Sequence, residues 1–335
     1  MEKILSVSVA AYNVESTLEE ALHPFAGSKY MDKLDIMVID DGSKDRTAKI
    51  AGKYEKRYPD VFRLIRKENG GWGSTLNVGM KEARGKYFKQ LDGDDYFSQE
   101  NLDGYIEFLS ECDADIVHTP YVSYDDRSGA ILNVVGVYGK SILPQRRTVR
   151  FSEIEGFMPA MHTLTVKTEI LKNSSMKITE HCFYTDVEFL LKACNLSKTV
   201  AYYELPIYFY RLARSGQSMS IQGVRKHYKD HLKMLETMLQ YEKLNVTSES
   251  MKKMFQLRLE SACDMQYKFF FALRHDKRRK MEIRQFDRML REKYPFYYEK
   301  TKSRMIRLLR KNNFFGYKIL AAIADRRSKR MKQGV

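Results

Sequence analysis

The sequence from residue 4 to residue 91 alternates short apolar runs with segments whose apolar residues follow helical spacing. The apolar runs are ILSVSVA (4–10), LDIMVI (34–39), VFRLIR (61–66) and YFKQL (87–91). Strands that alternate with helices of this length form a parallel sheet with right-handed crossovers. We therefore expect an α/β fold, in which the almost wholly apolar run LDIMVI suits a strand that is buried on both faces.

Polar residues follow each of these runs, at the point where the expected strand ends. They are Tyr12-Asn13, Asp40-Asp41, Asn69-Gly70-Gly71 and Asp92-Gly93-Asp94-Asp95. Ligands of parallel sheets bind beyond the carboxyl ends of the strands, so we expect these residues at one edge. Asp92 and Asp94 can hold one divalent cation, which would also contact the phosphates of a nucleotide. Because Asp and Gly are ordinary turn residues, the pair indicates a metal site only through its place in the sheet.

The chain after residue 101 continues this pattern and then changes character. A helix (101–112), a strand (116–124) and a hairpin around residues 125–129 are expected next. Residues 224–243, 248–274 and 279–293 carry apolar spacing of three and four residues, without the alternation of a strand. We expect two domains, an α/β domain over residues 1–220 and a helical region over residues 221–335.

The net charge of +15 is unevenly distributed along the chain. Residues 221–335 contain 30 of the 58 Lys and Arg residues but only 12 of the 43 Asp and Glu residues. The basic character therefore belongs to the C-terminal region and describes a partner of that region, such as an anionic membrane or nucleic acid. No nucleic-acid-reading motif accompanies the charge, so nucleic acid is not expected.

Residues 302–332 place apolar residues at helical spacing between two basic clusters, a pattern typical of helices that lie on an anionic membrane surface. The alternative is an amphipathic helix that packs on the first domain with a solvated basic face. No apolar run approaches the roughly 18–20 residues that span a bilayer, and the four cysteines are scattered in sequence. We expect a cytoplasmic protein with reduced thiols, peripheral on the inner face of the cell membrane.

Three blocks of the first domain resemble the family 2 glycosyltransferases, which are inverting enzymes that use nucleotide-diphosphate sugars. The blocks are VSVAAYNVESTLEEAL, MVIDDGSKDRT and ENGGWGSTLNVGMKEARGKYFKQLDGDD, and the resemblance covers about residues 4–219. Met161-His162, Tyr184-Thr185-Asp186 and the segment from Tyr210 to Ser218 resemble a bacterial subgroup of the same family.

The resemblance implies a GT-A fold, in which a Rossmann-like, mostly parallel sheet binds a nucleotide sugar, followed by the helical C-terminal appendage. It implies inverting transfer of a sugar from a nucleotide-diphosphate donor, expected to be a UDP-sugar, to a carbohydrate or lipid-linked acceptor in bacterial surface polysaccharide synthesis. It also implies a divalent metal, Mn²⁺ or Mg²⁺, as cofactor. The competing hypothesis is a catalytically inactive GT-A-like adaptor that binds anionic membrane or nucleic acid through its basic tail.

The resemblance also assigns roles to residues at the ends of the expected strands. The residues that line the nucleotide pocket are Ala10, Tyr12, Glu15, Asn69 and Gly70. Asp41 is expected to accept a hydrogen bond from the base, and Asp94 to ligate the metal directly. Asp92 is placed close to the ribose or sugar and is the second metal candidate.

Inverting transfer needs one carboxylate that removes the proton of the acceptor hydroxyl as this attacks the anomeric carbon. By resemblance Asp186, in the segment FYTDVEFLLKA, is this base, and Glu188 is the reserve candidate. The local pattern alone favours a helix N-cap for Asp186, with Glu188 as an acid of the first turn.

The segment from Arg211 to Ser218 carries guanidinium groups that can hold a diphosphate through forked hydrogen bonds. Arg211, Arg214 and Gln217 are the candidates for this contact, and the alternative is a solvated basic loop. His162 is a candidate contact for acceptor or phosphate, although an isolated His is more often structural. Trp72 either stacks on a sugar or base, or closes a loop over the core.

Overall fold

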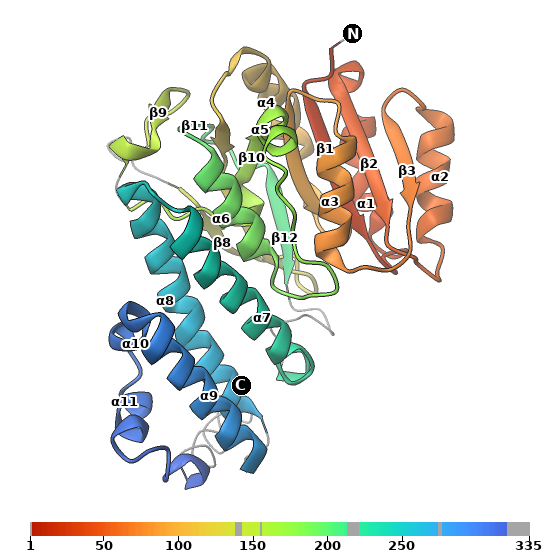
Figure 1. Ribbon diagram of the computed structural model, residues 1–335. Coiled ribbons are helices and arrows are strands. Elements are labelled where there is room, and N and C mark those ends of the chain that lie inside the picture. Colours follow the sequence, from red (N-terminus) through yellow and green to blue (C-terminus); the bar gives the residue numbers. More distant parts are fainter. Residues whose placement is uncertain (1, 138–142, 155, 213–220, 274–276, 320–335) are drawn as a thin grey trace. The chain divides into compact units, whose positions relative to one another are not determined.

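The computed structural model describes residues 2–137, 143–154, 156–212, 221–273 and 277–319, and Figure 1 shows the course of the chain. The chain divides into two compact units, residues 1–214 with 249–251 and residues 215–248 with 252–335. The first unit contains both β-sheets, and the described residues of the second unit are mainly helical.

A mostly parallel sheet of eight strands forms the centre of the first unit, in the order β3-β2-β1-β4-β10-β6-β11-β9. The strands are β1 Leu5–Ala11, β2 Leu34–Asp40, β3 Phe62–Arg66, β4 Tyr87–Asp92, β6 Ile116–His118, β9 Thr148–Arg150, β10 Leu164–Lys167 and β11 Thr199–Tyr202. The strands predicted within residues 4–91 are β1 to β4, and they pair in parallel. β10 joins β4 antiparallel, a reversal that the sequence pattern did not indicate.

Helices connect the parallel strands and cover the sheet (Figure 1). They are α1 Leu18–Ala26, α2 Thr47–Arg57, α3 Trp72–Glu82, α4 Gln99–Glu111, α5 Thr168–Asn173 and α6 Asp186–Leu196. The alternation of β1 to β4 with α1 to α3 confirms the predicted α/β fold.

The sequence of the central strand β1 alternates large apolar residues with serine, and the packing on the strand explains this pattern. Leu5, Val7 and Val9 are fully buried in the main hydrophobic core. The intervening Ser8 lies under α3, where a Cβ added to Gly79 would be 2.2 Å from the Ser8 Oγ atom. The small residues therefore allow α3 to pack closely on β1, above the strand end that carries the candidate site.

A second sheet of four strands has the order β5-β12-β7-β8. These are β5 Tyr96–Phe97, β7 Tyr121–Asp125, β8 Ile131–Val135 and β12 Tyr208–Leu212. The prediction of one strand over residues 116–124 is wrong, because the chain passes from the large sheet to the small one at Thr119-Pro120. Proline has no N–H to donate to a strand ladder, so it ends β6. The hairpin predicted around residues 125–129 joins β7 to β8.

The second unit contains the helices α7 Ile221–Asn245, α9 Lys277–Lys293, α10 Pro295–Lys300 and α11 Arg304–Lys311, and all but the first three residues of α8 Glu249–Ala272. The three helices predicted for this region correspond to α7, α8 and α9. Arg310 pairs with the buried Asp287 at 2.7 Å and ties α11 to α9. None of the helices in the described part of the chain combines the length and the apolar character needed to cross a bilayer.

Substitution of Gly79 by Ala is expected to destabilise the first unit by about 1–3 kcal/mol, because the new methyl group overlaps Ser8 and forces α3 away from β1. Urea unfolding followed by circular dichroism measures the change. Gly52→Ala in α2 is the matched control, because the nearest atom to its added Cβ is 3.9 Å away. Equal effects of the two substitutions would contradict the close approach of α3 to β1.

Candidate active site

The acidic turns after β2 and β4 meet at the carboxyl end of β1. The Ala11 carbonyl accepts a hydrogen bond from the Asp41 N–H, and the Ala10 carbonyl accepts one from the Gly93 N–H, both at 2.9 Å. β1 lies between β2 and β4, and Ala10 is level with Asp92 in the register of the sheet. The prediction that these strand ends share one edge is therefore confirmed.

The Asp41 carboxylate is buried and is surrounded by donors of the glycine-rich turn that follows β3. It accepts hydrogen bonds from Gly70 N (2.9 Å), Gly71 N (2.8 Å) and Asn69 Nδ2 (3.1 Å), and Lys67 Nζ lies 2.6 Å away. Gly71 has φ +80°, a conformation that favours glycine and turns its N–H toward the acid. Asp41 thus fixes the turn that carries Asn69 and Gly70, and its contact with a nucleotide base stays a prediction.

The loop after β1 carries the other residues expected at the nucleotide pocket. Ala10 is partly buried at the end of β1, and the Tyr12 side chain is 49% exposed. The Glu15 carboxylate accepts hydrogen bonds from the backbone N–H and the Nε of Arg46 at 2.8 and 3.1 Å. These bonds lower the pKa of Glu15. Glu15 therefore joins the loop after β1 to the loop after β2, and Tyr12 is left accessible to a ligand.

Asp92, at the end of β4, is the acid with the clearest functional environment. Trp72 Nε1 donates a hydrogen bond of 2.6 Å to the Oδ1 atom of Asp92. The tryptophan therefore contacts the acidic turn through its polar atom. Burial, and then the charges of Asp94 and Asp186, raise the pKa of Asp92 to about 7, while the Trp72 hydrogen bond acts to lower it. The charges of Asp94 and Asp186 therefore both act on Asp92. The roles expected of these three acids, as metal ligands and base, stay predictions.

Asp95 is a further acid of the turn after β4, and no role was predicted for it from the sequence. It is 1% exposed and accepts hydrogen bonds from the Tyr208 hydroxyl (2.6 Å) and the Arg211 N–H (2.8 Å). Burial, followed by the charges of Asp94 and Asp92, raises the pKa of Asp95 well above its usual range. The Asp92 N–H also donates to the Tyr208 hydroxyl oxygen, at 3.2 Å. Strand β12 therefore holds the acidic turn in place.

His162 lies beside the same acids, in a cage of aromatic rings. The ring centroids 4.5–4.8 Å from that of His162 belong to Tyr121, Tyr208 and Tyr210. Burial, and then the charge of Lys89, lower the pKa of His162 to about 3, so the imidazole is neutral. One atom each of Asp92, Asp95 and His162 lie within 4.8 Å of one another. These three residues could hold a metal ion. Asp94, the ligand expected from the sequence, is not among them, and its direct contact with a metal stays a prediction.

Lys89 in β4 is fully buried near this cluster, and the sequence pattern predicted no role for it beyond its place in a strand. Its Nζ donates to the carbonyl oxygens of His162 (2.9 Å) and Leu164 (3.0 Å). Burial lowers the pKa of Lys89 to about 7. The lysine therefore anchors the segment that carries His162 to the central sheet.

Asp186 is the first residue of α6, and Thr185 occupies the N-cap position. The cap interpretation of Asp186 is therefore wrong, while its place in the first helical turn favours the ionised carboxylate. Tyr184, two residues earlier, has φ +67°, a strained conformation of the kind that clusters at functional sites. Glu188 is 1% exposed, accepts the Thr179 N–H at 3.1 Å and pairs with Lys192 at 2.6 Å. These contacts give Glu188 a structural role and leave Asp186 as the better candidate for the base.

Arg211 directs its guanidinium group into the protein. Its Nε donates 2.7 Å to the Asp94 carbonyl, and its two terminal nitrogens pair with Asp126 and Glu20. The other two residues predicted to hold the diphosphate, Arg214 and Gln217, lie outside the described residues.

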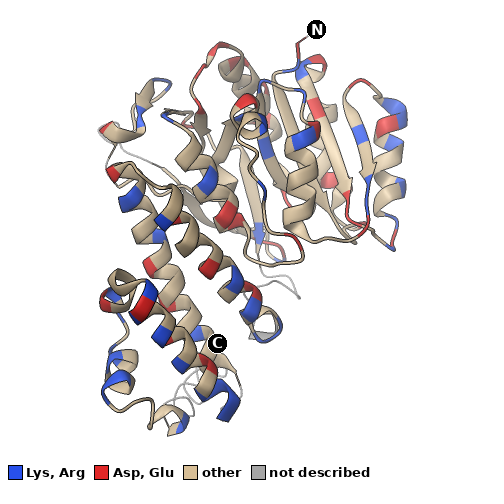
Figure 2. Ribbon diagram, in the orientation of Figure 1, with Lys and Arg blue, Asp and Glu red and all other residues tan. Residues whose placement is uncertain are grey.

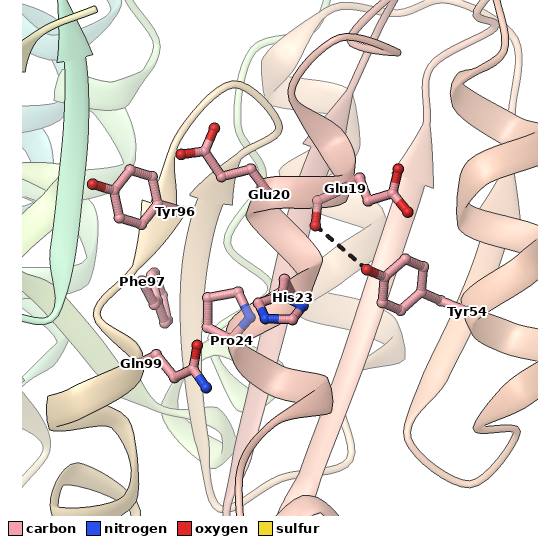
Figure 3. A pocket seen from close by; sticks show the side chains of 8 residues that line it. All are labelled: Glu19, Glu20, His23, Pro24, Tyr54, Tyr96, Phe97 and Gln99. Carbon is pink, nitrogen blue, oxygen red and sulfur yellow. Dashed lines mark hydrogen bonds between the residues drawn. The ribbon is translucent and has the colours of Figure 1, made fainter. Parts of the chain in front are cut away.

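A hollow of about 420 Å³ lies beside α1 (Figure 3). Its lining residues are Glu19, Glu20, His23, Pro24, Tyr54, Tyr96, Phe97 and Gln99. None of them belongs to the group of acids at the end of β1, although Glu20 also pairs with Arg211, which contacts the acidic turn.

Comparisons with known proteins identify the family. A model described as Glycosyl transferase family 2 matches residues 6–173. The chain therefore belongs to this family. Its relatives are named as glycosyltransferases, which favours an enzyme over the inactive adaptor. The uncharacterized glycosyltransferase EpsJ of Bacillus subtilis (strain 168) is 37% identical over 117 residues, which are 35% of this chain and 33% of EpsJ. The chain thus matches about a third of the length of this relative.

TarS of Staphylococcus aureus, a poly(ribitol-phosphate) beta-N-acetylglucosaminyltransferase, is 24% identical over 64% of this chain and 36% of TarS. The crystal structure of TarS residues 1–349 with UDP-GlcNAc has a TM-score of 0.59 and 20% identity, covering 89% of this chain and 88% of that one. The mannosyltransferase PcManGT of Pyrobaculum calidifontis, in complex with GDP-Man and Mn²⁺, has a TM-score of 0.55 and 15% identity, covering 96% and 87%. These likenesses show that the chain has the GT-A fold.

Replacement of Asp92 by Asn is expected to stabilise the metal-free protein at pH 8 by roughly 1–4 kcal/mol. The folded protein holds the Asp92 proton up to about pH 7, whereas the unfolded chain loses it near pH 4. Wild-type stability therefore falls relative to the variant between those two values. Urea unfolding in EDTA at pH 4.5 and pH 8 measures the difference, and a variant less stable than wild type at pH 8 would contradict it.

Proposed function

We propose that this protein is an inverting glycosyltransferase that moves a sugar from a UDP-sugar to a carbohydrate or lipid-linked acceptor in the assembly of a bacterial surface polysaccharide. The observation that carries the proposal is the group formed by Asp92, Asp94 and Asp186 beside the turn of Asp41 and the exposed Tyr12. Acidic turns at the carboxyl edge of a parallel sheet stand where ligands of such sheets bind, which suits a nucleotide sugar. The structure of TarS with UDP-GlcNAc supports the donor, and the poly(ribitol-phosphate) in the name of TarS supports an acceptor at the bacterial surface.

A divalent cation, Mn²⁺ or Mg²⁺, fits this group of acids. Carboxylate oxygens are the ligands that both ions prefer. The pKa of Asp92 is raised to about 7 because negative charges are buried close together, and a cation would favour the ionised form. Asp94 and Asp92 are the proposed ligands, with Asp95 and His162 as the neighbouring candidates. When bound, the cation neutralises the negative charge that develops on the departing diphosphate.

The transfer step requires a bond between the acceptor oxygen and the anomeric carbon as the bond from that carbon to the diphosphate breaks. We assign the proton of the acceptor hydroxyl to the Asp186 carboxylate. The position of Asp186 at the N-terminal end of α6 supports this role, because the helix dipole favours a carboxylate there. The nucleoside diphosphate then leaves, and the sugar is joined to the acceptor with inverted configuration.

Asp186→Asn is expected to lower transfer by roughly 10²–10⁴-fold, because the amide cannot accept the hydroxyl proton. Donor binding is expected to stay within about twofold, since the shape of the side chain is unchanged. Release of UDP in an acceptor assay measures the first quantity and calorimetry with UDP-sugar the second.

Glu100→Gln is the matched control, because Glu100 is also an acid in the first turn of a helix, α4, and is exposed. A loss of donor binding that equals the loss of transfer in Asp186→Asn would remove this residue from the role of base.

We also propose that the second unit holds the enzyme at the anionic inner face of the cell membrane. Figure 2 shows basic residues recurring along α7, α8, α9 and α11. α11 buries Ile306 and Leu309 and exposes on its other face Arg304, Arg307, Leu308 and Lys311. After α11, Phe315 and Ile319 are 86% and 70% exposed, and Lys280 Nζ lies 5.7 Å from the Phe315 ring centre. Exposed apolar side chains among basic ones suit the interface of an anionic bilayer.

The double substitution Phe315→Ser with Ile319→Ser is expected to weaken binding to vesicles that contain phosphatidylglycerol by roughly tenfold or more, because two apolar anchors are lost. Co-sedimentation of the full chain with the vesicles measures the effect. Leu257→Ser is the control, since Leu257 is a half-exposed leucine of α8 and does not belong to the segment after α11 that carries Phe315 and Ile319. Equal sedimentation of the double variant and wild type would contradict the membrane assignment.

A further inference from the structure

Arg211 touches the acidic turn at two points. Its backbone N–H donates to the Asp95 carboxylate at 2.8 Å, and its Nε donates to the Asp94 carbonyl at 2.7 Å. The residue is 8% exposed, and its guanidinium lies 5.4 Å from the ring centre of Tyr124. Arg211 is therefore built into the protein beneath the turn that carries the proposed metal ligands.

The guanidinium group pairs with two carboxylates, those of the half-exposed Glu20 and of the partly buried Asp126. One terminal nitrogen pairs with Glu20 of α1, and the other with Asp126, which follows β7. Two carboxylates therefore surround this one cation. A diphosphate that approached Arg211 would have to displace one of them, so the sequence-based role of Arg211 as a diphosphate clamp is disfavoured by this geometry.

Together these contacts connect three separate segments to the acidic turn. Glu20 belongs to α1, Asp126 to the hairpin of the second sheet, and Arg211 to β12. One hydrogen bond from Arg211 reaches the backbone carbonyl of Asp94, and the other reaches the side chain of the adjacent Asp95. A change in any of the three charged groups would shift the position of the turn and of the Asp94 carboxylate with it.

We propose that Arg211 is a positioning residue for the divalent cation: through the Asp94-Asp95 turn it holds the acidic ligands in the geometry that binds the ion, and it does not contact the diphosphate. This inference rests on the proposed function, because it takes the acidic turn to be the metal site. Groups that orient metal ligands typically contribute 10–100-fold to metal affinity. Glu20 and Asp126 act in the same unit, because they fix the guanidinium that fixes the turn.

The test measures two quantities in the full chain: Mn²⁺ binding in the presence of UDP, by electron paramagnetic resonance of the free ion, and UDP binding in EDTA, by calorimetry. The variants are Arg211→Lys, which keeps the charge but loses the fork, and the near-isosteric Glu20→Gln and Asp126→Asn. Arg146→Lys is the matched control, because Arg146 also pairs with an acid, Glu204, and lies over a tyrosine ring, that of Tyr203.

We expect Arg211→Lys to weaken Mn²⁺ binding by about 10–100-fold, with a smaller loss in Glu20→Gln and Asp126→Asn and none in Arg146→Lys. UDP binding in EDTA is expected to stay unchanged in all four variants. The diphosphate-clamp alternative gives the opposite pattern, because Glu20→Gln and Asp126→Asn would release the guanidinium and strengthen UDP binding in EDTA.

Two other results would overturn the inference in different ways. Unchanged Mn²⁺ binding in Arg211→Lys would overturn the positioning role alone. A wild-type protein that binds UDP but shows no binding of Mn²⁺ beside it would overturn the metal part of the proposed function, and the positioning role with it.

Discussion

Two hydrogen bonds from the end of β1 determine the geometry of the site. The carbonyl groups of Ala10 and Ala11 each hold one acidic turn, through Gly93 and Asp41. Because β1 is paired on both sides, these carbonyls can reach the strand ends of β2 and β4 at the same level. The turn after β2, with the proposed nucleotide contact Asp41, and the turn after β4, with the proposed metal ligands, are therefore neighbours, although about fifty residues of chain separate them.

The arrangement collects more negative charge than the metal-free protein compensates. Burial and neighbouring charges raise the pKa of Asp92 to about 7 and that of Asp95 well above its usual range. Two neutral groups stabilise these carboxylates by hydrogen bonds. The Trp72 indole donates to Asp92, and the Tyr208 hydroxyl donates to Asp95. A divalent cation would offset this negative charge, and the bound cation would then attract the diphosphate of the donor.

The sequence predicted the parts of the fold that depend on local pattern. Apolar runs and helical spacing located β1 to β4, and the rule that ligands bind at strand ends located the acids. The antiparallel entry of β10 beside β4 was not predictable in this way, because it depends on pairing between segments far apart in sequence. The sheet change at Thr119-Pro120 had a local signal, the proline, which the apolar pattern around it obscured.

The roles of individual residues were harder to predict than their location. Asp95 stands next to Asp94, and only the position of Tyr208 and the backbone of β12 makes it a buried anchor. Lys89 gave no signal within a strand, and its function depends on two carbonyl groups more than seventy residues away. Arg211 was expected to hold the diphosphate, and its contacts with Glu20 and Asp126 were not predictable because these residues come from elements that no motif connects.

The most direct test of this account is a crystal structure of the protein with UDP and Mn²⁺, in which anomalous scattering locates the ion. The account predicts one Mn²⁺ between the carboxylates at the end of β4 and the diphosphate, with the uridine beside the turns after β1 and β2. A manganese peak away from Asp92 and Asp94, or a diphosphate bound at another edge of the sheet, would contradict it.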